Sequence, residues 1–110
     1  MEDKLEEIFS LQKGLTEMMS LDRYTDDVEG RIAALCTAMI HEAVELQRTT
    51  NWKWWKKPTE FNQVEAREEL ADIWHFLIQA SLELGLTPDD ILKEYQRKNE
   101  INRQRQKDGY

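Results

Sequence analysis

Two short acidic motifs have the residue types and the spacing to bind a metal: Glu42-Ala43-Val44-Glu45 and Glu69-Leu70-Ala71-Asp72. Each lies in a stretch predicted to be helical, and helical residues three apart share one face. If the two helices pack together, four carboxylates meet in one pocket and repel each other unless a divalent cation neutralises them. All-oxygen ligation suits Mg²⁺ or Mn²⁺, and such ions typically hold phosphate oxygens. The motifs therefore predict chemistry on a polyphosphate.

The position of Glu42 supports the metal interpretation. On a helical wheel Glu42 falls between Leu35 and Leu46, inside an apolar stripe, and Glu45 lies at the edge of that stripe. A carboxylate that faces a core is costly unless it is paired or bound to a metal. An ordinary solvated helix surface therefore explains Glu42 poorly.

The second motif leaves two interpretations open. Glu69 borders apolar residues, but Asp72 shares a helix face with Glu65, Gln79 and Glu83, and solvent alone would be enough to satisfy that face. Two such motifs on consecutive helices favour a metal site over surface acids.

A second group of residues combines aromatic rings with cations. Residues 51–58, Asn-Trp-Lys-Trp-Trp-Lys-Lys-Pro, directly follow the first acidic helix. A Trp ring such as Trp54 can stack on a base, and Lys can contact phosphate. Alternatively, the Trp rings cap a helical core with the Lys stems packed across them. Phe76, one turn after Asp72, is either an aromatic wall of the site or part of the core.

A third group lies near the C-terminus. Lys98, Asn102 and Arg105 follow an i, i+4, i+7 pattern and share one helix face. Two cations flanking an amide donor form a suitable clamp for phosphates. The alternative is a solvated basic helix end, which the helix dipole also favours.

The elements that must position these groups are predicted to be helices throughout. Apolar residues recur at helical spacing over residues 2–20, 28–48 and 62–84, and a fourth helix runs from 87 to about 107. Thr25 or Asp26 is the expected N-cap of the second helix, Asn62 of the third and Thr87 of the fourth. Residues 1–110 are therefore predicted to form one all-α domain, a four-helix bundle.

Composition narrows the class of protein. Of 110 residues, 34% are charged and the net charge is -7. The charge is -10 up to Leu92 and +3 from Lys93 onwards, so a general nucleic-acid binder is not expected. Cys36 is the single cysteine and is expected to be a buried structural residue in a reducing cytoplasm. An acidic N-terminus and the lack of a long apolar run predict neither a signal peptide nor a membrane partner.

The order of these motifs resembles the all-α nucleoside triphosphate pyrophosphohydrolase (MazG-like) superfamily, and within it the dimeric-type dUTPases. The Trp–Lys segment followed by Asp72-Ile73-Trp74-His75-Phe76 is similar to that family's lysine loop and D-x-x-H-F segment. The C-terminal residues 98–110 resemble its K-N-x-x-N-x-x-R-Q-x-x-G-Y motif, and Gln12 with Leu15 resembles its Gln motif. Many relatives carry Asn or Asp after that Leu, where this chain has Thr16, and this residue bears on base selectivity.

The resemblance implies a Mg²⁺-dependent dUTP diphosphatase that releases dUMP and pyrophosphate and acts as a homodimer or tetramer. It implies a metal site formed by Glu42, Glu45, Glu69 and Asp72, with Glu45 as the expected general base. It implies a uracil site formed by Gln12, Trp54 and Phe76. It implies phosphate contacts from Lys98, Asn102, Arg105 and Tyr110.

Two alternatives to this interpretation remain open. A broader MazG-like enzyme would take dCTP or other nucleoside triphosphates. A non-catalytic helical module would only bind a nucleotide or dimerise, and its acids would keep the surface solvated.

Overall fold

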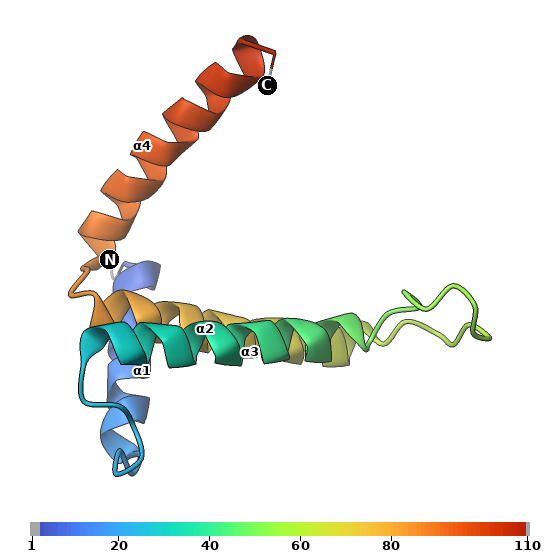
Figure 1. The fold of residues 1–110 in the computed structure, drawn as a ribbon, viewed down its shortest axis with the longest axis horizontal. Helices are drawn as coiled ribbons and strands as arrows, with labels where there is room; N and C mark the ends of the chain where they lie inside the picture. Colours follow the sequence, from blue (N-terminus) through green and yellow to red (C-terminus); the bar gives the residue numbers. More distant parts are fainter. Residues whose placement is uncertain (1–2, 110) are drawn as a thin grey trace.

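The fold is known from a computed structural model that describes residues 3–109, and its regular elements over that range are helices (Figure 1). The prediction of an all-α chain with four helices is confirmed. The helices are α1 (Lys4–Met18), α2 (Val28–Gln47), α3 (Gln63–Glu83) and α4 (Pro88–Lys107).

Polar caps explain where the helices begin. Asn62 accepts a hydrogen bond from the Glu65 N–H at the start of α3, and Thr87 forms a reciprocal capping box with Asp90 at the start of α4. Each cap satisfies backbone donors that the first helical turn leaves without a partner. The predicted cap of α2 was wrong by one or two residues, because Asp27 occupies that position and accepts from the Gly30 N–H.

Helices α2 and α3 form the centre of the fold. They run antiparallel and side by side, and α1 crosses the pair and packs on α3 (Figure 1). Helix α4 leaves the end of α3 and extends away from the pair, contacting chiefly α1. The expected bundle is therefore open on the side of α4.

The core that these contacts enclose is small. Among the described residues, the apolar side chains that are buried are Phe9, Leu35 and Ile78, from α1, α2 and α3 respectively. The radius of gyration is 17.4 Å, whereas a compact domain of this length has a radius of about 13 Å. Cys36 is exposed, contrary to expectation, because α3 covers only one side of α2.

The Trp–Lys segment lies in a connection that reaches away from the α2–α3 pair, at the end opposite α4 (Figure 1). Asn51 closes this connection at its base. Its side-chain N–H donates to the Thr59 carbonyl at 2.8 Å, and its side-chain oxygen accepts from the Thr59 N–H at 2.9 Å. Within the connection, the Trp55 ring packs edge-on against the Trp52 and Trp54 rings. The three rings thus form a cluster of their own instead of capping the core of this chain.

The small core makes each of its members important for stability. We expect Ile78→Ala to lower the free energy of unfolding by about 2–5 kcal/mol, because Ile78 is only 4% exposed and its loss leaves a cavity. Ile78→Val is the matched control and is expected to cost about 0.5–1.5 kcal/mol. Urea unfolding at one fixed protein concentration measures both. Equal losses in the two variants would contradict a packed Ile78.

Candidate active site

The two acidic motifs meet because α2 and α3 pack side by side in opposite directions. Glu42 on α2 and Glu69 and Asp72 on α3 each offer a carboxylate oxygen, and these oxygens all lie within 4.8 Å of one another. Glu42 and Glu69 are half-buried and Asp72 is exposed. The predicted convergence of the two helices is therefore present for three of the four acids.

Glu45, the fourth acid of the predicted set, stands outside this group. Its carboxylate lies 3.7 Å from the Arg48 guanidinium in an exposed i, i+3 ion pair. Glu45 is nevertheless close enough to Glu69 for its charge to act on that residue.

The electrostatics of the acidic group are repulsive. Desolvation, followed by the charges of Asp72, Glu42 and Glu45, raises the pKa of Glu69 above its ordinary value of 4.5. The folded protein therefore disfavours the charged form of Glu69.

The donor set fits a hard divalent cation. Mg²⁺ prefers carboxylate oxygens at about 2.0–2.1 Å in octahedral geometry, so oxygens on one ion lie about 3–4 Å apart. The oxygens of Glu42, Glu69 and Asp72, all within 4.8 Å of one another, are close to that separation. Bound there, such an ion would neutralise the repulsion that the acids create.

An open cavity of about 620 Å³ adjoins the acids and is lined by Glu42 and Asp72 among other residues. Gln12 from α1 and Phe76 from α3, both expected to contact a base, line the same cavity. Phe76 thus contributes an aromatic wall to this space. Two of the three side chains expected to hold a base and two of those expected to hold a metal therefore line one cavity.

His75 also lines the cavity. Its Nδ1 lies 2.8 Å from the Ala71 carbonyl oxygen, which can only accept, so Nδ1 carries the hydrogen. In the neutral ring, Nε2 is then an acceptor. His75 therefore offers a polar ring to the cavity.

The C-terminal part of one face of α3, at Gln79 and Glu83, lies inside the molecule, although the sequence left a solvated face possible. Gln79 is 7% exposed, and the Glu83 side chain is 12% exposed. Both belong to a polar network that reaches α1 and α2, which explains how they can be buried. Asp72, on the same face, is exposed and borders the cavity.

The other predicted site residues are not brought to the cavity within this chain. Trp54 is 86% exposed on the long connection. Lys98, Asn102 and Arg105 lie on α4, which contributes no residue to the cavity lining. Tyr110 lies outside the described residues.

Sequence reasoning missed part of the cavity wall. Residues 19–21, Arg23 and Tyr24 line it from the connection between α1 and α2. This connection has no apolar periodicity to reveal which side chains turn inward. The Tyr24 hydroxyl is buried, and desolvation, followed by the negative charge of Glu83, raises the pKa of Tyr24.

A family model described as dUTPase matches residues 4–88 and, in a second match, residues 79–110. The chain belongs to this dUTPase family. The resemblance seen in the sequence is thereby confirmed.

A dCTP pyrophosphatase from Enterobacteria phage T4 is 32% identical to the chain over 78 residues. The aligned stretch covers 60% of this chain and 46% of the phage protein, so the chain matches about half the length of that relative. No solved structure matches the chain at a significant level.

No helix in the described part of this dUTPase-family chain has the length and apolar character needed to cross a membrane.

Removing one charge from the acidic group tests its electrostatics. We expect Glu69→Gln to stabilise the metal-free protein at neutral pH. Because the folded pKa of Glu69 is higher than the unfolded one, the wild-type folded state takes up a proton first as the pH falls. Wild-type stability therefore rises through the window just above pH 4.5, and the difference between the two proteins shrinks there.

Thermal unfolding in EDTA and in Mg²⁺ at neutral and mildly acidic pH measures this effect. In Mg²⁺ wild type is expected to be the more stable of the two proteins, because it keeps a metal ligand that the variant lacks. Glu68→Gln, which removes an exposed acid outside the group, is the matched control. It should be as stable as wild type both in EDTA and in Mg²⁺. Destabilisation by Glu69→Gln in EDTA would contradict the repulsion.

Proposed function

We propose that the chain is a Mg²⁺-dependent dUTP diphosphatase that hydrolyses dUTP to dUMP and pyrophosphate, with Mn²⁺ as a possible substitute ion. The observation that carries the proposal is the shared cavity, where Gln12 and Phe76 lie in one space with Glu42 and Asp72. A volume of about 620 Å³ is within the range of small-molecule sites. Membership of the dUTPase family supports the same chemistry.

In this proposal the chain binds the two ends of the nucleotide separately. Phe76 packs against the base and Gln12 hydrogen-bonds it, while Glu42, Glu69 and Asp72 hold the metal. An ion held by these residues would supply the positive charge that offsets the phosphates and the leaving group and would lower the pKa of a water molecule. No covalent nucleophile from the protein is required.

Glu45 is our candidate for the general base. It lies one turn from Glu42 but outside the convergent group, so its carboxylate is not needed to bring the three acids together. Its exposed position gives access to a water molecule. The Arg48 guanidinium lies 3.7 Å from this carboxylate.

A second candidate substrate is dCTP. The phage relative is named a dCTP pyrophosphatase, and the departure at Thr16 lies in the cavity wall where a base would be read. A broader pyrophosphohydrolase would use the same acids and differ only in how it selects the base.

Pyrophosphate release from a panel of dNTPs and rNTPs, with and without Mg²⁺, tests the activity. We expect release that depends on Mg²⁺ and is confined to dUTP. Release from dCTP would replace the substrate but keep the chemistry. No release from any nucleotide would overturn the proposal and leave a non-catalytic helical module as the alternative.

Variants of the acids test their roles on the best substrate of that panel. We expect Glu42→Gln and Asp72→Asn each to lower turnover at least about 100-fold, since even residues that only support metal ligands are worth 10- to 100-fold. Glu68→Gln serves as the control on α3 and should retain turnover. Near-normal turnover of either variant with saturating Mg²⁺ would refute the metal site.

We further propose that the chain acts as a homodimer or tetramer in the cytoplasm, with no nucleic-acid or membrane partner. Large apolar side chains are exposed on the single chain, with Leu11 67%, Ile40 64% and Val64 68% exposed. Burying such surface favours association. A second copy would also supply an α4 whose Lys98 and Asn102 reach the phosphates.

Light scattering measures the first part of this proposal, and we expect a mass at least twice the 13.1 kDa of one chain. Mixing two variants tests whether a second copy supplies the α4 that reaches the phosphates. Asp72→Asn and Lys98→Ala are each expected to be inactive alone and to recover activity when mixed, because one site of a mixed dimer has both groups. A 13.1 kDa species, or no recovery in a mixed oligomer, would contradict the respective part.

A further inference from the structure

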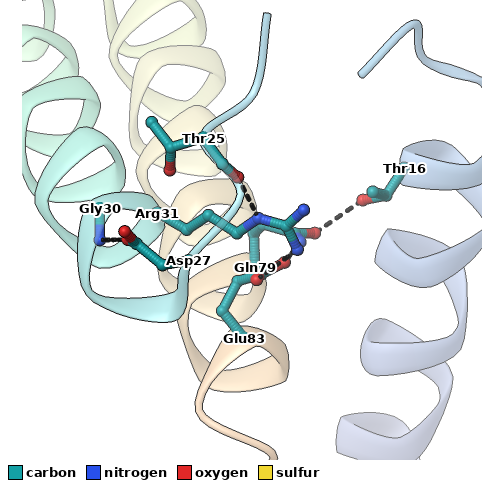
Figure 2. A network of polar contacts seen from close by, with 7 residues as sticks. All are labelled: Thr16, Thr25, Asp27, Gly30, Arg31, Gln79 and Glu83. Atoms are coloured by element: carbon teal, nitrogen blue, oxygen red, sulfur yellow. Dashed lines mark hydrogen bonds and ion pairs between the residues drawn. The ribbon is translucent and has the colours of Figure 1, made fainter. Parts of the chain in front are cut away.

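Arg31 ties three parts of the cavity surroundings together. Its Nε donates to the Thr25 carbonyl at 2.7 Å, and its NH1 group lies 3.2 Å from the Glu83 carboxylate. Its guanidinium also stacks over the Tyr24 ring, 4.5 Å from the centroid. Figure 2 shows Arg31 reaching from α2 to the connection that holds Thr25 and to Glu83 on α3. One side chain thus holds a cavity wall, through Tyr24, against α3.

A directed chain of hydrogen bonds continues from Glu83 into the cavity (Figure 2). Glu83 accepts from Gln79 Nε2 at 2.9 Å. Gln79 Oε1 then accepts from Thr16 Oγ1 at 2.6 Å and from Gln12 Nε2 at 3.2 Å. The chain runs from α2 through α3 to α1, and its last three members line the cavity.

The direction of this chain is fixed by its first two members. Arg31 can only donate and an ionised Glu83 can only accept, so Gln79 must turn its NH₂ group toward Glu83. Its oxygen must then face α1, where only a donor satisfies it. Gln12 therefore commits its own NH₂ group to Gln79.

Because its NH₂ group is engaged, Gln12 can offer a ligand only its side-chain oxygen. Its Oε1 is buried and has no hydrogen-bond partner among the described residues. A buried acceptor without a partner is unfavourable, so a ligand that brings an N–H group to it recovers a lost hydrogen bond. Gln12 itself lines the cavity, so this acceptor belongs to a residue of the cavity wall.

We propose that Arg31 and Glu83 are positioning residues for base recognition: through Gln79 they orient Gln12 as a hydrogen-bond acceptor, which selects a base that presents an N–H group at that point. Either the N3–H of uracil or the N4 amine of cytosine meets this requirement. The inference rests on the proposed function, because it assumes that the cavity receives the base.

A purely structural clamp would explain the network less well. Such a clamp would be expected to close on itself, with each polar atom paired, whereas this one ends at an unpaired oxygen of a cavity residue. Tyr24, held by the same Arg31, has a buried hydroxyl that interacts with Gln79 and Glu83 of the network. Gln12 and Tyr24 both line the cavity.

Glu83→Gln is the decisive variant, because it keeps the shape of the side chain but no longer fixes the direction of the hydrogen bonds. A Gln at this position mismatches one neighbour whichever way it turns, so the Gln79 and Gln12 amides can reverse. We expect the ratio of kcat/KM between the best and second-best dNTP to fall at least about 10-fold, since reading by hydrogen bonds can discriminate by far more. The change should lie in KM, because the acids that hold the metal are untouched.

Arg31→Met should act in the same direction, and Arg31→Lys, which keeps a donor, should restore part of the discrimination. Glu94→Gln is the matched control, because it breaks an exposed 3.0 Å ion pair with Arg97 on α4. Thermal unfolding confirms that each variant is folded. A general loss for all bases, or an unchanged ratio in both Glu83→Gln and Arg31→Met, would overturn the positioning role.

Equilibrium binding of dUMP and dCMP without metal separates this inference from the proposed function. If wild type turns over no nucleotide but binds one monophosphate better, the enzymatic proposal fails, and the binding ratio in Glu83→Gln still decides the inference. Loss of the preference in that variant would support it. Binding of neither monophosphate, together with no turnover, would overturn both.

Discussion

The packing of α2 against α3 is the constraint on which the rest of the structure depends. It buries Leu35 and Ile78 in the small core, and it also brings Glu42 against Glu69 and Asp72. The apolar contact and the repulsive contact therefore belong to one interface. The attraction of apolar surface has to exceed the repulsion between carboxylates for the two helices to stay together without a cation.

This arrangement gives the cavity two chemically different kinds of lining. Carboxylates supply one kind, and neutral amides and a hydroxyl whose hydrogen bonds lead back to Arg31 supply the other. A nucleotide has the same division, with its anionic phosphates at one end and its neutral base at the other. The match between the two patterns explains how one small cavity can serve both a metal and a base.

The helices and the acidic group could be predicted from the sequence because both follow from local spacing. The side chains of Asn62 and Thr87 indicate where two helices start. Glu42 is recognised as a site residue because it interrupts an apolar stripe. Burial of Gln79 and Glu83 could not be predicted, because it depends on partners in α1 and α2 that are 52 or more positions away in the sequence. The open position of α4 likewise has no local signal.

The clamp that Asn51 makes on Thr59 has a consequence for the entropy of binding. A loop that is free in solution loses conformational freedom when its side chains dock, and this loss weakens binding. Here two hydrogen bonds already close the loop, and its three Trp rings already pack against each other. Much of the conformational ordering of the loop is therefore complete before another molecule contacts the Trp rings. Even a small contact area on the rings would then yield useful affinity.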